Sequence, residues 1–349
     1  MTSIFVAFAF LGLIGATAIA GDGNEVKFST FFQASAGGIS KIAGDPNTGT
    51  LFVGSETNIC AVNPEGALLW ALATPAYVRN IQFTSREQII VSCRQFGLVA
   101  LDRKGQESWR FREANFDPMG VALDYEGNVY CVAAAGLIRL DPTGASLWKL
   151  RLNDASGIPV IGVGNRIIVQ SKYGITCIER NGAFAWEILL PEPQENDVTA
   201  DETLVLVPRG ERLYAVSPEG RVAWTFDSDS GAFGAPVVIS KSGELRVVTA
   251  TKMLSISRRG EVLWQQKLPR QTTQRAGVVV DDKDNCYCIP SFGPSEILAV
   301  RNNGEIIDHA DAGYLALPDA IWFRGSLFYV GIGPQGMGEV RCFHLSRPK

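Results

Sequence analysis

A tryptophan that follows a turn glycine by four residues recurs along most of the chain. The turn glycines are Gly66, Gly105, Gly144, Gly182, Gly220, Gly260 and Gly304. Four residues after the first six of them stand Trp70, Trp109, Trp148, Trp186, Trp224 and Trp264. These are six of the seven tryptophans in the chain, and Asp308 takes the place in the seventh repeat. A spacing of about 40 residues is typical of proteins built from stacked supersecondary units. The chain is therefore expected to fold as a series of similar modules.

Each glycine lies in a turn between two strand-like segments. Asn63-Pro64-Glu65-Gly66 predicts a type I turn closed by a glycine with positive φ, which makes a hairpin with a β-bulge. The segment before the glycine is apolar on both faces, as in buried strands. The segment after it alternates, so Leu68, Trp70 and Leu72 are expected to share one apolar face. Phe184-Trp186-Ile188 and Val222-Trp224-Phe226 repeat this pattern.

A small residue stands five positions before most of the glycines. The column contains Ala61, Ala100, Cys177, Ala215, Ser255 and Ala299, with Arg139 as the exception. Small side chains allow close packing, and we expect a neighbouring sheet to approach the strand at these positions.

Two further strand-like segments precede each pair, so one repeat contains four short strands. The stretch from Gly120 to Leu152 shows all four. Such a unit is one blade of a β-propeller. We therefore predict an all-β fold, an eight-bladed β-propeller of four-stranded blades, in which the tryptophans fill the seams between neighbouring blades.

Closure of the ring is predicted from the two ends of the sequence. The last hairpin, Ser326–Ile332 with Glu339–Leu345, has no outer strand after it. The segment Val26–Phe32 is a strand without a nearby hairpin partner. We expect it to supply the missing outer strand, because closure removes an exposed sheet edge. Residues 21–349 then form a single propeller domain.

The repeat resembles the tryptophan-docking repeat of the pyrroloquinoline-quinone (PQQ)-like eight-bladed propellers. Arg212–Trp224, "RLYAVSPEGRVAW", and Asn58–Trp70, "NICAVNPEGALLW", are the clearest examples. This family includes quinoprotein dehydrogenases and non-enzymatic members of the BamB type. The resemblance implies a clamp of two consecutive cysteines and a Ca²⁺ ion in the dehydrogenases, and a lipidated N-terminal cysteine in BamB. Neither feature is present in this sequence, so the resemblance implies the propeller without a site, and the BamB-type members are the better comparison.

The first twenty residues differ from the rest. They contain no charged side chain and end in small residues at Ala18 and Ala20, which is typical of a cleaved secretory signal. We expect residues 1–20 to be a signal peptide and the mature protein to be periplasmic or extracellular, without a membrane span. An uncleaved anchor of marginal length is the alternative.

Composition and motifs argue against several classes of function. The formal net charge is −4 and there is no basic run, so nucleic acid is not an expected partner. Seven cysteines stand at irregular spacing and there are only two histidines, which is too few for a conventional zinc site. Whether the cysteines form disulfides stays open. We therefore expect no catalytic, cofactor or metal site.

Loops are where such scaffolds bind partners. The candidate partner-binding residues are Arg94, Phe96, Tyr173, Arg209, Arg212 and Phe292, because arginine and aromatic side chains are enriched at interfaces. The sequence favours an exported, monomeric, non-catalytic scaffold that binds protein, with envelope or outer-membrane protein assembly as a possible setting. A quinone-dependent or small-molecule-binding dehydrogenase or sensor is the alternative.

Overall fold

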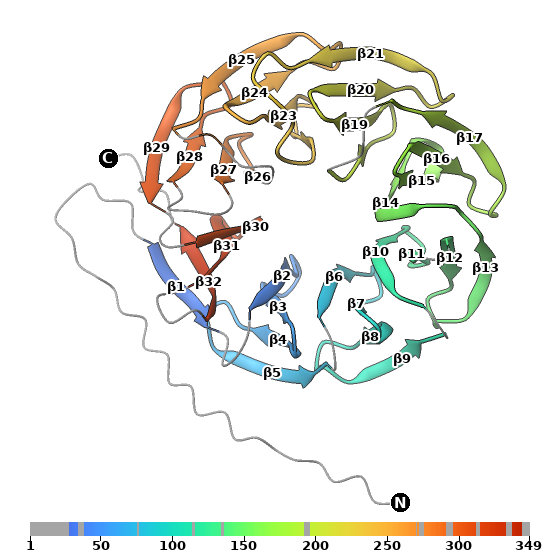
Figure 1. Ribbon diagram of the computed structural model, residues 1–349. Helices are drawn as coiled ribbons and strands as arrows, with labels where there is room; N and C mark the ends of the chain where they lie inside the picture. The colour runs from blue at the N-terminus through green and yellow to red at the C-terminus, as the bar shows by residue number, and fades with distance from the viewer. Residues whose placement is uncertain are drawn as a thin grey trace, which may run out of the picture.

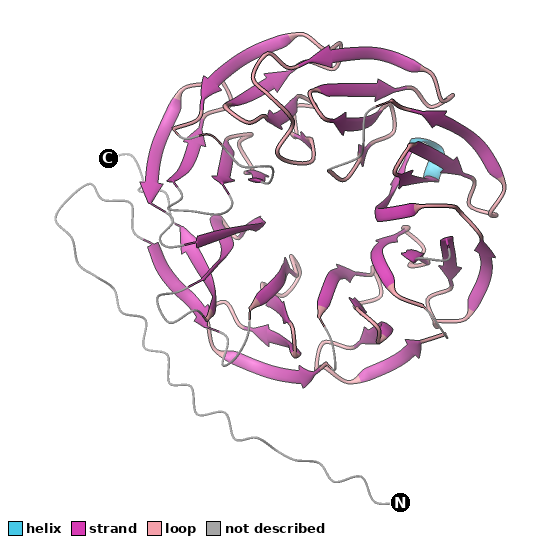
Figure 2. Cartoon of the chain, viewed as in Figure 1, coloured by secondary structure: helices cyan, strands magenta, loops and turns pink. Residues whose placement is uncertain are grey.

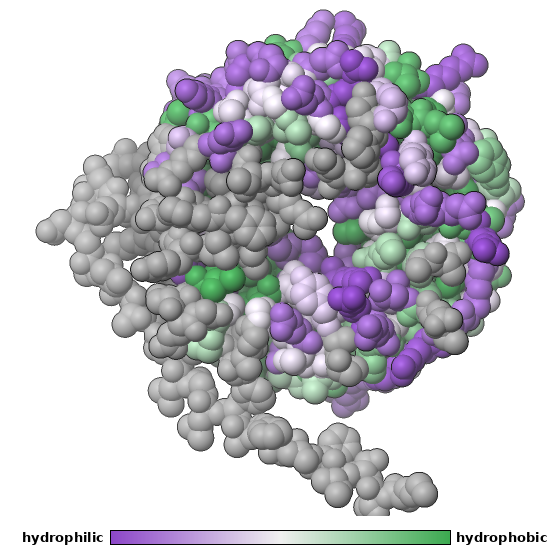
Figure 3. Space-filling model, viewed as in Figure 1, coloured by the Kyte–Doolittle hydropathy of each residue, from purple (hydrophilic) through white to green (hydrophobic). Residues whose placement is uncertain are grey.

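The computed structural model describes a ring of β-sheets around a central opening (Figures 1 and 3). It describes residues 28–33, 38–74, 77–113, 116–133, 136–191, 196–269, 271, 276–290, 296–311, 315–332 and 337–343. These residues form eight four-stranded antiparallel sheets, which confirms the predicted eight-bladed propeller. The predicted signal peptide, residues 1–20, lies outside the described residues.

The strands occupy equivalent places in every blade (Figure 2). The innermost strands are β2 (Ile39–Gly44), β6 (Val78–Phe83), β10 (Pro118–Leu123), β14 (Ala155–Gly162), β18 (Thr199–Ala200), β22 (Val238–Ile239), β26 (Ala276–Val280) and β30 (Leu315–Phe323). The second strands are β3 (Leu51–Ser55), β7 (Ile89–Cys93), β11 (Val129–Ala133), β15 (Arg166–Ser171), β19 (Val205–Arg209), β23 (Leu245–Val248), β27 (Cys286–Pro290) and β31 (Ser326–Ile332). The third strands are β4 (Asn58–Val62), β8 (Gly97–Leu101), β12 (Gly136–Leu140), β16 (Gly174–Ile178), β20 (Arg212–Val216), β24 (Lys252–Ile256), β28 (Glu296–Val300) and β32 (Gly338–Phe343). The outer strands are β5 (Leu68–Ala73), β9 (Glu107–Phe111), β13 (Ser146–Leu150), β17 (Phe184–Leu189), β21 (Val222–Asp227), β25 (Val262–Lys267), β29 (Ile306–Asp311) and β1 (Phe28–Gln33). A short 3-10 turn, η1 (Val163–Asn165), joins β14 to β15. We number the blades 1 to 8 from the blade of β2–β5 to the blade of β30, β31, β32 and β1.

The predicted hairpin turn is confirmed in blade 1. Gly66 has a φ of 86°, and its N–H donates to the carbonyl of Asn63 at 3.0 Å. The Asn63 side-chain oxygen accepts from the backbone N–H groups of Glu65 and Ala67, which explains the preference for Asn or Asp at this place. The register shifts between Ala61 and Val62 where the outer strand contains one extra residue, as in a β-bulge.

The tryptophan of each outer strand contacts the turn of the next blade. Trp70 Nε1 donates to the carbonyl of Arg103 at 2.8 Å, two residues before Gly105. A Cβ on Gly105 would lie 2.7 Å from Trp70 Cδ2, and the φ of Gly105 is 77°. The glycine is therefore required both by the backbone and by the indole packed against it. The same donation, at 2.8–3.0 Å, joins Trp109, Trp148, Trp186, Trp224 and Trp264 to the turns that follow them.

The column of small residues adjoins both the indole and the next blade. Ala61 is the register partner of Trp70 on the neighbouring strand of its own blade. The same pairing relates Ala100 to Trp109 and Ala215 to Trp224. Ala61 also packs in one cluster with Ile81 of blade 2. The small side chain therefore makes room for the indole of its own blade and lies against the neighbouring sheet, as expected.

The expected apolar face of the outer strand is wrong for its first residue. Leu68 is 46% exposed, Phe184 is 62% exposed and Val222 is 45% exposed. The β-bulge lies at this point of each strand. The extra residue breaks the two-residue alternation, so the apolar face begins only at the tryptophan.

The N-terminal strand closes the ring, as predicted. β1 pairs with β32 in antiparallel register, from Phe28 opposite Phe343 to Gln33 opposite Glu339. Figure 1 shows β1 as the outer strand beside β32, next to blade 1. The Phe31 ring packs edge-on against Phe328, with ring centroids 5.0 Å apart. The first two residues of the predicted segment, 26 and 27, lie outside the described residues.

Candidate partner-binding face

The blade topology divides the loops between two faces of the ring. The turns that contain the repeated glycines lie on one face, together with the hairpins between first and second strands. We call this the turn face. The hairpins between second and third strands lie on the opposite face, together with the connections from each outer strand to the next blade. We call this the connection face. The five predicted partner-binding residues that the structure describes belong to segments at or beside this face, because each lies between or next to strands that end there.

Four of the predicted residues, Arg94, Phe96, Tyr173 and Arg212, have exposed or partly exposed side chains. Arg94 is exposed and Phe96 is partly buried in the hairpin between β7 and β8. The Arg110 guanidinium lies over the Phe96 ring, 4.0 Å from its centroid. Tyr173 is 56% exposed, with Lys172 Nζ 5.2 Å from its ring. Cation–π contacts of this kind stabilise the position of each ring modestly. Phe292 lies outside the described residues.

Arg209 does not fit the expected role of an exposed contact residue. Its side chain is fully buried at the end of β19. The guanidinium donates to the carbonyls of Lys172 at 3.1 Å and Gly174 at 3.2 Å in the hairpin of the preceding blade. It lies in the seam because the strand still runs inside the sheet at this residue. Arg209 therefore fixes the loop that carries Tyr173, and it cannot contact a partner at the surface.

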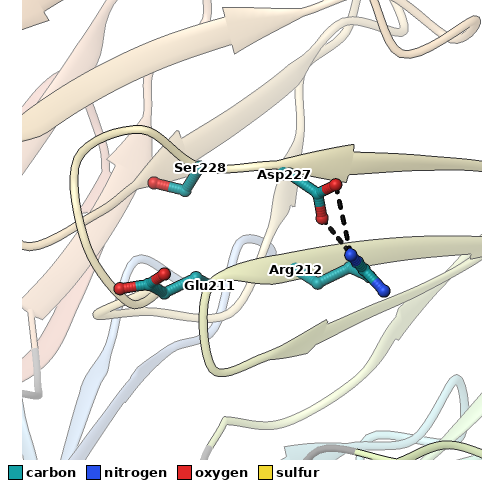
Figure 4. A pocket seen from close by; sticks show the side chains of 4 residues that line it. All are labelled: Glu211, Arg212, Asp227 and Ser228. Atoms are coloured by element: carbon teal, nitrogen blue, oxygen red, sulfur yellow. Dashed lines mark hydrogen bonds and ion pairs between the residues drawn. The ribbon is translucent and has the colours of Figure 1, made fainter.

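Arg212 lines a hollow at the rim of the connection face. The hollow has a volume of about 400 Å³ and is lined by Glu211, Arg212, Asp227 and Ser228. Arg212 forms an ion pair with Asp227 through two of its nitrogens, as Figure 4 shows. The hydrogen bond from Arg212 lowers the pKa of Asp227. Because both side chains are exposed, the pair contributes little to stability.

The central opening contains an ion pair between blades 1 and 8. Lys41 Nζ lies 2.5 Å from Asp319 Oδ1, and the other carboxylate oxygen accepts from the backbone N–H of Ile42. Burial by itself would lower the pKa of Lys41, but Asp319 outweighs burial and the pKa is raised. Lys41 therefore stays charged, and its ion pair joins the last blade to the first.

Prediction from the sequence missed two arginines of the connection face. Arg112 and Arg151 each follow an outer strand directly, seven residues after the turn glycine of their repeat. Both are exposed. Aligning the repeats beyond the tryptophan would have shown that blades 2 and 3 have arginine in the same column.

The structure does not offer the quinone clamp of the family's dehydrogenases. All seven cysteines are buried and free, and they lie on separate strands or, for Cys286 and Cys288, two residues apart on β27. Within the described parts of the chain, no three His, Cys, Asp or Glu side chains converge as a metal site would need. The thiols therefore do not fit the clamp. No helix among the described residues is long and apolar enough to cross a membrane.

Comparison with known proteins agrees with this architecture. BamB from Moraxella catarrhalis superposes with a TM-score of 0.69 at 14% identity, over 93% of this chain and 98% of that one. Sqt1 from Saccharomyces cerevisiae gives a TM-score of 0.72 at 11% identity, over 89% and 98% of the two chains. The dihydro-heme d1 dehydrogenase NirN gives 0.65 at 12% identity, over 78% and 66%. At such identities the likeness concerns the fold alone.

A search of curated protein sequences found no match. A protein-family model described as outer membrane protein assembly factor BamB matches residues 125–312, which is more than half of the chain. The match spans the outer strands of blades 3 to 7, including four of the six repeated tryptophans. The chain therefore belongs to the BamB-like family of PQQ-type β-propellers.

Proposed function

We propose that this protein is an exported, monomeric, non-catalytic propeller whose connection face binds a protein partner in the cell envelope. The observation on which the proposal rests is the set of exposed arginine and aromatic side chains on this one face. Buried side chains hold the loops of this face in place. The Arg209 guanidinium, for example, donates to backbone carbonyls of the loop that carries Tyr173. Side chains presented on a rigid scaffold lose little conformational entropy on binding.

Membership of the family supports the setting that we propose. The family model is described as an outer membrane protein assembly factor. The uncharged segment 1–20 is the signal that would export the chain. We propose that it is cleaved and that residues 21–349 work as one domain.

Site-specific photo-crosslinking in the cells that make the protein tests the proposal. The photoreactive residue p-benzoylphenylalanine would replace Tyr173 on the connection face. As a control it would replace Leu147, which is 50% exposed on outer strand β13. We expect a discrete crosslinked protein from the Tyr173 position and none from the Leu147 position. No crosslinked species at Tyr173, or the same species at both positions, would contradict the proposal.

A second measurement separates the scaffold from the dehydrogenase. Purified protein would be incubated with the quinone and Ca²⁺ and assayed for dye-linked turnover of common alcohols and sugars. We expect no turnover and no thermal shift, because the family's clamp of consecutive cysteines has no counterpart here. Turnover that requires the quinone would make the enzyme the better interpretation.

A further inference from the structure

We propose that the connection face over blades 2 and 3 binds an acidic, extended segment of the partner through Arg94, Arg112 and Arg151. The inference rests on the proposed function and specifies the chemistry of the partner. We call these three arginines, with Tyr77 and Phe96, the basic patch.

The three arginines of the basic patch have no acidic partner within the part of the chain that the structure describes. All three are exposed. The adjoining loop residues 75–76, 114–115 and 134–135, which the structure does not describe, are Pro, Ala and Asn and have no acidic side chain. One exposed acid, Asp154, follows Arg151 closely in sequence. Three arginines outweigh this one acid, so the patch is positive in a chain whose formal net charge is −4.

The other acids of this region are engaged within the protein. Asp117 accepts from Arg79 at 3.2 Å and from the backbone N–H of Gln95 at 3.1 Å. Glu113 forms an ion pair with Lys149 of β13. These contacts fix the connection between blades 2 and 3. They also pair the carboxylates of Asp117 and Glu113 with the cations Arg79 and Lys149. Arg94, Arg112 and Arg151 are left free to bind carboxylates from outside.

Backbone contacts hold the blade 2 part of the basic patch together, and the ion pair of Glu113 with Lys149 joins it to β13, which ends directly before Arg151. The N–H of Arg94 donates to the carbonyl of Tyr77 at 2.9 Å. A Cβ on Gly97 would lie 3.4 Å from the Cα of Arg112, so the Arg94–Phe96 hairpin lies beside Arg112. Tyr77 is 43% exposed. Figure 3 shows hydrophilic side chains gathered over the blades of β6 and β10.

Arginine beside the exposed Tyr77 ring and the partly buried Phe96 ring fits a peptide that contains both carboxylates and apolar groups. Arginine binds carboxylates with two parallel hydrogen bonds, and the rings take up apolar side chains. Nucleic acid fits less well. Its binding generally requires several phosphate contacts, and the acidic chain around the patch repels a long polyanion.

Fluorescence anisotropy with a labelled synthetic peptide that repeats Glu-Glu-Tyr-Gly tests the inference. We expect binding to the full mature chain that weakens as salt is raised. The variant R94Q/R112Q/R151Q should bind about tenfold more weakly. The matched control is R86Q/R221Q/R259Q, which removes the same charge from exposed arginines of the turn face. It should stay within about twofold of the parent chain.

Three comparisons decide between the alternatives. Equal loss of peptide binding in both triple variants would show an effect of net charge alone and overturn the inference. Equally tight binding of a Gln-Gln-Tyr-Gly peptide, of duplex DNA or of anionic phospholipid vesicles would overturn it as well. If the Tyr173 crosslink persists while the acidic peptide does not bind, the inference fails and the scaffold function stands. If neither is observed, both fail.

Discussion

At the scale of single residues, the pairing of one tryptophan with one glycine of the next blade is the unit from which the ring is built. The indole covers a glycine that has positive φ, and its N–H binds the carbonyl two residues before that glycine. The residue opposite the indole in its own blade is small to make room for it. Substitution of the tryptophan, the glycine or the small residue therefore changes the packing at a seam between two blades.

Replacement of Trp148 by alanine should lower the free energy of unfolding by about 3 kcal/mol. The indole is partly buried, and its Nε1 donates to the carbonyl of Arg180 at 3.0 Å. Trp148→Phe should cost less, because it keeps most of the ring and removes the hydrogen bond, worth about 1 kcal/mol.

Urea unfolding would measure both variants against Leu147→Ala. Leu147 is the neighbour of Trp148 on β13 and is half exposed, so its loss should cost less than about 0.5 kcal/mol. A Trp148→Ala variant no less stable than Leu147→Ala would show that the seam does not depend on the indole.

The cysteine thiols should be unreactive until the protein unfolds. Burial raises the pKa of Cys60 to about 12 and that of Cys342 to about 11. The thiolate is the reactive form, and the folded chain forms almost none of it at neutral pH. Ellman's reagent should detect no thiol in the native protein and all seven after denaturation without reductant. Fewer than seven would show a disulfide, contrary to the structure.

At the scale of the strand, the outer position of each blade explains why the chain must close on itself. Outer strands are paired on one side only, and in seven blades a hairpin attaches them to the third strand. In blade 8 no hairpin connects β32 to its outer strand, since β1 comes from the other end of the sequence. The eighth sheet therefore depends on contacts between residues more than three hundred positions apart.

Removal of β1 should destabilise the ring and expose an edge. A variant without residues 21–33 leaves the outer edge of β32 unpaired and uncovers Phe328, which packs against Phe31. Unpaired edges recruit other chains. We expect a lower melting temperature and concentration-dependent association in size-exclusion chromatography.

Restoration by a separate peptide would be the control for this variant. A synthetic peptide with the sequence of residues 26–33 should restore both melting temperature and monomeric elution. A truncated protein that stays monomeric with the original melting temperature would show that β1 is not needed for closure.

At the scale of the whole molecule, one kind of arginine–aspartate ion pair recurs at every second seam from blade 1 to blade 6. The residue two places before the turn glycine alternates along the chain, as Pro64, Arg103, Pro142, Arg180, Pro218 and Arg258. Each of these arginines pairs with an aspartate in the first turn of the preceding blade. The pairs are Arg103 with Asp45, Arg180 with Asp124, and Arg258 with Asp201. The seams between blades 1 and 2, 3 and 4, and 5 and 6 share this bond, so blades 1 to 6 follow a period of two.

Acid should weaken the seams of Asp124 and Asp201, whose pKa values are lowered in the folded protein. Burial by itself would raise the pKa of Asp124, but hydrogen bonds from Asn128 and Tyr130 and the charge of Arg180 outweigh it, and the pKa lies below the ordinary 3.8. A carboxylate whose pKa is lowered on folding stabilises the folded state above its unfolded pKa. That stability is lost as the pH falls through the folded value.

Asp124→Asn should therefore be less stable than the parent at pH 7, by about 2 kcal/mol, and the difference should shrink below pH 4. Urea midpoints measured across this range test the expectation. Glu261→Gln is the control, because Glu261 is exposed and its side chain makes no ion pair among the described residues. A deficit for Asp124→Asn that does not depend on pH would attribute the effect to packing instead of charge.

The sequence by itself determined the repeat, the number of blades and the strand that closes the ring. These follow from spacing, turn chemistry and alternation, which are local properties repeated many times, and one repeat supports the interpretation of the next. The placement of Ser326–Ile332 as a strand of the last blade is an example. The tertiary structure decided where individual side chains point at the ends of strands. The sequence predicts Arg209 to be an exposed loop residue, but its side chain is buried in a seam. The sequence predicts Leu68 to lie on the apolar face, but its side chain is exposed beside a bulge. At such positions burial depends on the neighbouring blade and on bulges in the register, and neither is set by the residues on either side in the sequence.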